Sequence, residues 1–286
     1  MPPTNLLILL SDEHAPRFLG CNGHPLVRTP HLDRLAARGT LFENAYTPSP
    51  ICVSARAALA TGKWVHQTGC WSSAEPYNGS PPGWAHHLRG RGHEVVAIGK
   101  LHYRSSADDN GFSEERLPMH VANEVGWVQG LLRHDPLPFA DAADYAGEVG
   151  RGESDYTRYD RMVCGAACEW LRARAARRAQ EPWVLLVSFV APHYPLTAPP
   201  EFFDLYRDLD TGTVEISATG HDTAHPVAAA LAEFFNYHDY FDAMRAAEAR
   251  RAYFGLCSFL DHNVGQVLRA LADSGCESRT RVLYTS

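Results

Sequence analysis

The sequence predicts an α/β protein built around a mostly parallel sheet. Short, continuous apolar runs alternate along the chain with longer amphipathic segments, and Gly- and Pro-rich turns separate them. An apolar run without polar alternation is typical of a strand covered on both faces, as strands are in parallel sheets. With 286 residues, of which 45% are hydrophobic and 21% charged, the chain can bury a substantial core.

The first hundred residues show this alternation clearly. Residues 6–10 are a short apolar run and predict a buried strand. A helix is expected from Pro30 to Arg38, because Thr29 is a good N-cap, proline suits the first helical position and Gly39 can end the helix. Further strands are expected at 41–46 and 94–98, and further helices at 53–60 and 82–89.

The rest of the chain repeats the pattern around two loop-rich stretches, at about 103–150 and 197–240, which are expected to be insertions. Between and after them the sequence predicts a helix at 156–179, a strand at 183–190, a helix at 243–272 and a strand at 281–284. No loop or helix follows this last strand, where α/β proteins usually place functional residues. We therefore expect residues 1–286 to be one incomplete N-terminal catalytic domain.

Composition excludes some classes of protein. The net charge of -7 argues against nonspecific nucleic-acid binding, which needs a basic surface. The first apolar run is too short for a membrane span, and no basic segment precedes it, so no membrane association is expected. Seven cysteines without a CxxC pair favour free thiols and a cytoplasmic location; Cys164 and Cys168, four apart, are expected to pack rather than bond. An oligomer is compatible with the sequence.

Two short segments carry residue types suited to chemistry. Asp12 and Glu13 directly follow the first strand, and adjacent carboxylates at such a strand end suit a hard divalent cation; a solvated turn is the alternative. Cys52 begins a predicted helix, and Arg56 lies one turn further on the same side. A helix start favours an anionic nucleophile or an anionic substrate oxygen, whereas a buried structural cysteine is the alternative.

Several blocks together resemble the sulfatase family. Cys52-Val-Ser-Ala-Arg56, followed by Thr61-Gly-Lys, is similar to the family signature Cys-x-Pro/Ala/Ser-x-Arg with a downstream Thr-Gly. The chain is most similar to the choline-sulfatase-like and phosphonate monoester hydrolase-like branch of the alkaline phosphatase superfamily. The other matching blocks, in family order, are 11–13, 19–24, 29–36, 99–102 and 191–195, and weaker similarity continues through 258–271 and the final strand.

The resemblance implies a fold, a cofactor and a mechanism. It implies an alkaline-phosphatase-like three-layer sandwich whose C-terminal part is missing here. It also implies that a formylglycine-generating maturation enzyme oxidises Cys52 to formylglycine, whose hydrated aldehyde attacks sulfur or phosphorus with one oxygen and later expels the ester with the other. A divalent metal would assist, with Ca²⁺ favoured over Mg²⁺ or Mn²⁺.

The resemblance also assigns roles to individual residues. Asp12, Glu13 and the group derived from Cys52 would bind the metal, and Arg56 would orient that group. Lys100 and His102 would hold the anionic head group, although Lys100, one of only two lysines in the chain, could instead be an exposed loop cation. His193 would bind substrate or protonate the leaving group.

Two other polar segments are expected to be structural. His66 lies in a short Trp-Val-His-Gln segment, and residues 261–263, Asp-His-Asn, fall within a predicted amphipathic helix, where we expect its solvated face. Ser54 stands where proline or alanine is more usual in the family signature. The acidic and amide or histidine ligands that follow the final strand in the family do not occur in these 286 residues.

The sequence therefore predicts hydrolysis of a small anionic ester. Sulfate ester hydrolysis leads, with choline sulfate or aryl sulfates as examples. A phosphonate monoester or phosphodiester hydrolase could use the same site, because these monoanions share tetrahedral geometry. A third hypothesis is an inactive fragment or a binding protein that keeps the fold without the chemistry.

Overall fold

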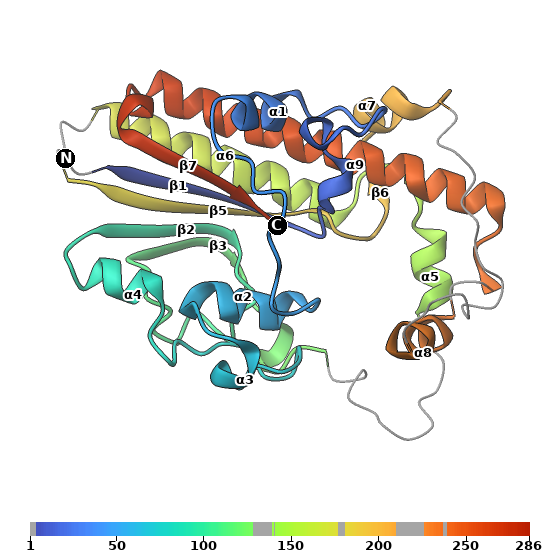
Figure 1. The fold of residues 1–286 in the computed structure, drawn as a ribbon, viewed down its shortest axis with the longest axis horizontal. Helices are drawn as coiled ribbons and strands as arrows, with labels where there is room; N and C mark the ends of the chain where they lie inside the picture. The colour runs from blue at the N-terminus through green and yellow to red at the C-terminus, as the bar shows by residue number, and fades with distance from the viewer. Residues whose placement is uncertain (1–3, 128–138, 140, 177–180, 210–225, 237–238) are drawn as a thin grey trace.

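Five parallel strands form the central sheet of the computed structural model, which describes residues 4–127, 139, 141–176, 181–209, 226–236 and 239–286. The strand order is β3-β2-β5-β1-β7, so strands distant in sequence are neighbours in space (Figure 1). The strands are β1 (Asn5–Asp12), β2 (Glu94–Lys100), β3 (Glu114–Met119), β5 (Trp183–Pro192) and β7 (Thr280–Thr285).

Helices cover both faces of this sheet and give three layers (Figure 1). One face carries α1 (Pro30–Ala37), α6 (Asp155–Ala176) and α9 (Ala243–Asp273), and the other carries α2 (Cys52–Thr61), α3 (Val65–Thr68) and α4 (Trp84–Arg89). Successive strand side chains alternate between the layers: Leu9 joins the core on the α6 and α9 side, and Leu10 joins the core on the α2 side. This two-sided burial explains the continuous apolar runs, and it confirms the predicted α/β class with a parallel sheet.

The two predicted insertions contain more structure than expected. The first includes β3, an edge strand that was missed because its sequence, Glu-Glu-Arg-Leu-Pro-Met, is charged as exposed edges often are. Residues 128–138, 140, 210–225 and 237–238 lie outside the described part. The remaining elements are α5 (Ala142–Gly147), β4 (Gly150–Arg151), β6 (Thr197–Ala198), α7 (Pro200–Phe203) and α8 (Pro226–Phe235), with short 3₁₀ turns between elements.

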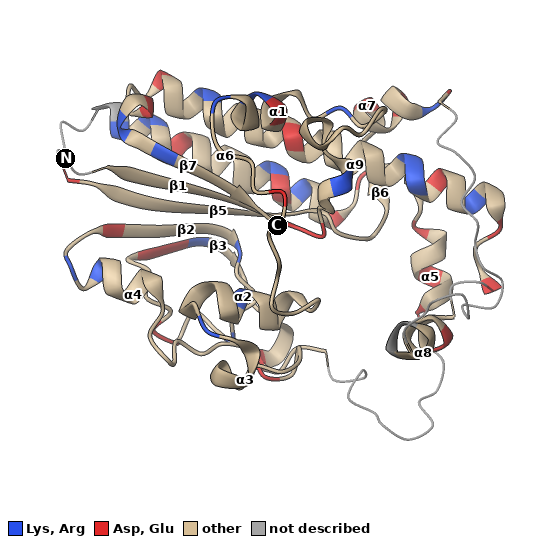
Figure 2. Ribbon diagram, in the orientation of Figure 1, with Lys and Arg blue, Asp and Glu red and all other residues tan. Residues whose placement is uncertain are grey.

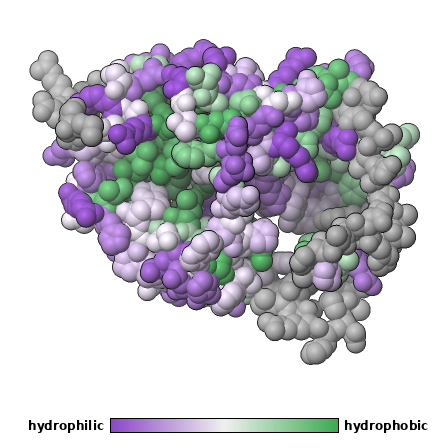
Figure 3. All heavy atoms as spheres, in the orientation of Figure 1, coloured by the Kyte–Doolittle hydropathy of each residue, from purple (hydrophilic) through white to green (hydrophobic). Residues whose placement is uncertain are grey.

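The strand predicted at 41–46 does not form. This segment pairs with none of the described strands, although β3 and β7 are both edge strands. Its apolar side chains face solvent, with Phe42 72% and Tyr46 89% exposed. The edge strand β7 likewise leaves Leu283 42% exposed. Hydrophobic side chains gather on the face of the molecule over this part of the sheet (Figure 3).

The solvated face predicted for residues 261–263 is wrong for two of the three. Asp261 is 2% exposed and Asn263 1%, because α9 packs against both α1 and α6 at this point. The Asp261 carboxylate accepts the backbone N–H groups of His31 and Leu32 at 3.0 and 2.8 Å, so it satisfies the free donors at the start of α1. Asp261 is therefore a buried carboxylate that caps α1, and not a solvated surface residue as expected.

The cysteine prediction is confirmed: all seven are free, and Cys164 and Cys168 are buried. Within the described part of the chain, no helix combines the length and apolarity that crossing a membrane requires.

Candidate active site

Cys52 and Asp12 line the same cavity, which has a volume of about 460 Å³. It opens where β1 and β7 end and where α2 begins, so Asp12 comes from a strand end and Cys52 from the first helical residue. Figure 2 shows acidic residues at this end of β1. The cavity therefore brings together the two segments on which the predicted chemistry depends, as expected at the carboxyl edge of a parallel sheet.

A buried charge cluster forms the floor of the site. The Asp12 carboxylate oxygen Oδ2 lies 2.7 Å from Lys100 Nζ and 3.1 Å from the Arg56 guanidinium. All three side chains are nearly inaccessible, with residue exposures of 7%, 1% and 6% for Asp12, Lys100 and Arg56. Burial alone would raise the pKa of Asp12, but the two cations outweigh it and hold that pKa well below its ordinary value. Lys100 is thus buried in this cluster and is not an exposed loop cation.

Arg56 connects three strands of the sheet. Besides Asp12 on β1, its guanidinium donates to the Lys100 carbonyl on β2 at 2.6 Å and to Ser188 Oγ on β5 at 3.0 Å. These fixed bonds hold the head of the side chain in one orientation. Arg56 therefore helps to fix Asp12 and the Lys100 backbone relative to each other.

The Cys52 thiol is not activated as a thiolate. Burial raises the pKa of Cys52, and the Asp12 carboxylate adds to this, against the opposing effects of Lys100 and Arg56. The helix start and Arg56 therefore do not produce an anionic sulfur at neutral pH. His102 Nδ1 lies within hydrogen-bond distance of the sulfur, at 3.4 Å.

His102 is held beside Cys52 by its backbone. It adopts a positive φ of 52°, and its N–H donates to the Met119 carbonyl of β3 at 2.8 Å. Burial lowers the pKa of His102 far below its ordinary value, and Lys100 and Arg56 lower it further. His102 is consequently a neutral imidazole, with Nδ1 facing the Cys52 sulfur.

Glu13 and His193 form the outer side of the site. His193 follows β5, and its Nε2 lies 3.6 Å from Glu13 Oε1. Partial removal from solvent and the Asp12 carboxylate raise the pKa of Glu13 to about 7, although its side chain is 49% exposed. Burial together with Lys100 lowers the pKa of His193 to about 4. His193 Nδ1 donates to the Tyr194 carbonyl at 2.7 Å, which leaves Nε2 of the neutral ring as the acceptor.

The predicted metal ligands make an incomplete set. Among the described residues, no three His, Cys, Asp or Glu side chains are grouped as a metal ion would need. Asp12 and Glu13 offer the oxygen atoms that Ca²⁺ or Mg²⁺ prefers, but Asp12 already pairs with two cations, and Ca²⁺ takes about six to eight oxygens. These residues could supply part of a cation site and not all of it.

Comparison with known proteins identifies the family. The sulfatase family model matches residues 3–286. The chain belongs to the sulfatase family. The resemblance predicted from the motif blocks is thereby confirmed.

Relatives of this sulfatase chain cover nearly all of it. It is 30% identical to a choline-sulfatase of Rhizobium meliloti (strain 1021), over 99% of this chain and 56% of that protein. It is 28% identical to arylsulfatase K of Bos taurus, over 99% of this chain and 52% of that protein. The crystal structure of a phosphonate monoester hydrolase of Agrobacterium radiobacter superposes with a TM-score of 0.74 at 21% identity, covering 98% of this chain and 62% of that one. The predicted sulfatase-type sandwich is confirmed, and the chain spans about half the length of the sulfatases it matches.

Sequence reasoning missed two residues that support the site. Ser188 was hidden in the buried β5 run, and only its contact with Arg56 reveals it. Asp160 lies on α6, is 0% exposed, and accepts the backbone N–H groups of Val190 and Ala191 at 2.8 Å each. Its position on the apolar face of that helix, in step with Val163 and Ala167, was a usable signal. His66, by contrast, is exposed on α3 and does not line the cavity.

Replacing Asp160 by asparagine should destabilise this sulfatase chain by about 1–3 kcal/mol, because one amide oxygen cannot accept both N–H groups. Burial raises the pKa of Asp160 to about 7, so the folded state holds this proton more strongly than the unfolded chain does. The wild type should therefore gain stability relative to the variant as the pH falls from about 8 to about 5. Urea unfolding at both pH values measures this gap.

Asp155→Asn is the matched control for Asp160→Asn, because it lies on the same helix with a side chain 95% exposed. The difference in free energy of unfolding between Asp155→Asn and the wild type should stay nearly constant over the same pH range. If the difference between Asp160→Asn and the wild type became smaller as the pH fell, Asp160 would not have a raised pKa in the folded state.

Proposed function

We propose that this chain hydrolyses sulfate esters through an oxygen nucleophile derived from Cys52. The observation that carries the proposal is the shared cavity: Cys52, at the start of α2, lines it together with Asp12 and Arg56. Asp12 is paired with Lys100 as well as Arg56, and His102 lies 3.4 Å from the Cys52 sulfur. Membership of the sulfatase family supports the reaction class. The chain spans only about half the length of these relatives, so hydrolytic activity is proposed for it and does not follow from the similarity alone.

The charge balance of the cluster suits an anionic ester. Lys100 and Arg56 carry two positive charges against the one negative charge of Asp12, and all three are buried, where electrostatic effects are strong. The N-terminus of the ten-residue helix α2 adds a partial positive charge at Cys52. A sulfate group bound here would meet excess positive charge without any rearrangement of the residues that supply it.

The raised pKa of the Cys52 thiol argues against direct use of the sulfur as a thiolate nucleophile. Formylglycine would supply a hydrated aldehyde, whose one oxygen attacks the ester and whose other oxygen permits its release. This assignment requires a formylglycine-generating enzyme as a maturation partner. Neutral His102 is positioned to hydrogen bond with a group at the position of Cys52, and neutral His193 to accept a hydrogen bond at Nε2 on the outer side of the site.

A divalent cation belongs to the same proposal. Asp12 and Glu13 would hold it, with Ca²⁺ preferred over Mg²⁺ or Mn²⁺, and it would polarise the oxygens of the ester. The pairing of Asp12 with Lys100 and Arg56 opposes this, since a cation must compete with both. We therefore propose weak cation binding by these 286 residues.

The mass of the peptide containing Cys52 tests the nucleophile directly. When the chain is produced together with a formylglycine-generating enzyme, this peptide should be lighter by about 18 Da, the change from thiol to aldehyde. Peptides containing Cys21 or Cys276, which lie outside the cavity, should keep their thiol masses. An unmodified Cys52 peptide together with no release of sulfate from an aryl sulfate would favour the inactive fragment or binding protein.

A phosphonate monoester hydrolase is the second candidate, favoured by the structural similarity to the Agrobacterium radiobacter enzyme. Sulfate and phosphonate monoesters both present a tetrahedral monoanion, so the buried cluster alone does not distinguish them. Paired assays with a phenyl sulfate and a phenyl phosphonate ester separate the two. Faster release from the sulfate supports the leading proposal, and faster release from the phosphonate supports the second.

A further inference from the structure

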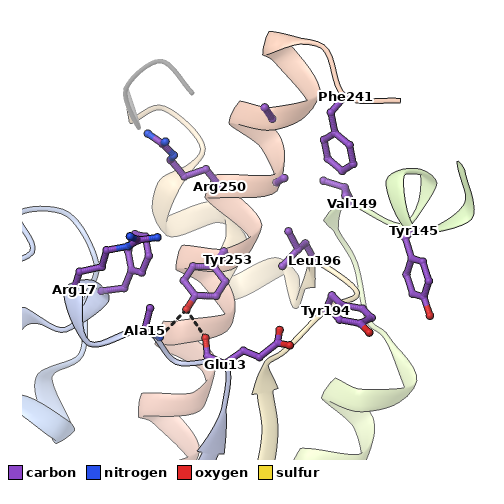
Figure 4. Close-up of a pocket in the computed structure, with 13 residues that line it drawn as sticks. Glu13, Ala15, Arg17, Tyr145, Val149, Tyr194, Leu196, Phe241, Arg250 and Tyr253 are labelled. Atoms are coloured by element: carbon purple, nitrogen blue, oxygen red, sulfur yellow. Dashed lines mark hydrogen bonds between the residues drawn. The ribbon is translucent and has the colours of Figure 1, made fainter. Parts of the chain in front are cut away.

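A second, larger cavity adjoins the outer side of the site (Figure 4). Its volume is about 690 Å³, enough for an organic group of moderate size. Glu13 and Tyr194 line its inner end. Glu13 Oε1 lies 3.6 Å from His193 Nε2, and the rings of His193 and Tyr194 are 4.2 Å apart between centroids. The part of an ester that extends past His193 would therefore enter this cavity.

One wall of the cavity is apolar and aromatic. Figure 4 places Tyr145, Val149, Leu196 and Phe241 together on one side, and the ring of Tyr145 meets that of Tyr194 edge-on at 5.1 Å. Such a wall suits a hydrocarbon or aromatic group, because large apolar surfaces gain most from burial and rings pack well edge to face.

The opposite wall is cationic. Arg17 and Arg250 lie across the cavity from Phe241 and Val149 (Figure 4). The hydroxyl of Tyr253, between the two walls, donates to the Glu13 carbonyl at 2.7 Å and accepts the Ala15 N–H at 3.1 Å, so its ring remains as apolar surface. Among the described lining residues Glu13 alone is acidic, and it lies at the inner end.

We propose that this cavity binds the organic group of the substrate, and that this group is apolar or aromatic with a second negative charge, such as a carboxylate, at the end away from the ester. The inference rests on the proposed function for the position of the ester. Arg17 and Arg250 would pair with the second anion while the aromatic wall covers the hydrocarbon part. A quaternary ammonium group such as that of choline would instead face two arginines, so choline sulfate is a poor substrate for this chain.

Binding of the bare organic group tests the cavity without requiring catalysis. We expect 3-phenylpropionate to bind the 286-residue chain at least about fivefold more tightly than 3-phenylpropan-1-ol at low salt, with choline weakest, by isothermal titration calorimetry. Arg17→Gln should remove most of the preference for the carboxylate, and Arg17→Gln combined with Arg250→Gln should abolish it. Arg91→Gln, an exposed arginine beyond α4, should leave it unchanged.

Arg17 is exposed, so its single variant should fold normally and keep the test interpretable if the double variant does not. Tightest binding by choline, no binding by any of the three compounds, or an unchanged preference in Arg17→Gln would each overturn the inference. Sulfate release from phenyl sulfate tests the proposed function separately. If that release is absent while the carboxylate preference persists, the reaction assignment fails and the cavity assignment stands; the converse result rejects the cavity assignment alone.

Discussion

Replacing Asp12 by asparagine should lower the free energy of unfolding by about 3–5 kcal/mol, the usual effect of breaking a buried ion pair from one side. The substitution keeps the shape of the side chain and removes its charge. Lys100 and Arg56 would then be two buried cations without a counter-ion, since both lie against the same carboxylate oxygen. Urea or thermal unfolding measures the loss.

Two further variants show whether charge is the cause. Asp12→Asn combined with Lys100→Met removes one of the two unpaired cations, so it should recover part of the lost stability, about 1–3 kcal/mol. Asp208→Asn changes an exposed aspartate in a turn and should alter stability by less than about 0.5 kcal/mol. If the double variant were less stable than Asp12→Asn alone, unpaired positive charge would not be the cause of the stability lost in Asp12→Asn.

The elements that could be predicted from sequence are those whose local residue pattern indicates whether the segment is buried and where it begins and ends. The runs that became β1, β2 and β5 are apolar because helices cover both faces of the sheet, and the segment from Pro30 carries its own start and stop residues. The predictions for residues 41–46 and for β3 were wrong in opposite ways: a predicted strand did not form, and an unpredicted strand did. The first is apolar but has no partner, and the second is charged but pairs with β2, so in both cases a non-local partner decided the outcome.

The same distinction separates the predictable from the hidden parts of the site. Asp12 and Lys100 end a strand and Cys52 begins a helix, and parallel topology brings such ends to one edge of the sheet, so their meeting could be expected. Ser188 could not be assigned, because it acts through a contact with Arg56, 132 positions away. The helical pattern does place Asp160 on the apolar face of α6, but it could not reveal the partners, Val190 and Ala191, which lie 30 and 31 positions away. The burial of Asp261 depends likewise on α1, more than 200 residues earlier in the chain.

Replacing Cys52 by alanine should reduce sulfate release by about 10³-fold or more when the chain is produced with a formylglycine-generating enzyme. Alanine cannot be converted to an aldehyde, while the Asp12, Lys100 and Arg56 cluster makes no hydrogen bond to the sulfur and should remain intact. The variant should therefore still bind an aryl sulfate with nearly unchanged affinity, because the excess positive charge that attracts the anion is retained. A chromogenic aryl sulfate gives the rate, and equilibrium titration gives the affinity.

The cysteine that best controls this experiment is Cys276, half-buried outside the cavity, and Cys276→Ala should keep sulfate release within about twofold of the wild type. Loss of affinity together with rate in Cys52→Ala would mean that the substitution disturbed the cluster and did more than remove the nucleophile. An unchanged rate would mean that the cavity attracts the anion but that attack comes from another group, and neutral His102, 3.4 Å from the sulfur, would then be the first residue to replace. If Cys52→Ala still binds the aryl sulfate but no longer releases sulfate, attack is assigned to residue 52 and recognition of the anion to the Asp12, Lys100 and Arg56 cluster.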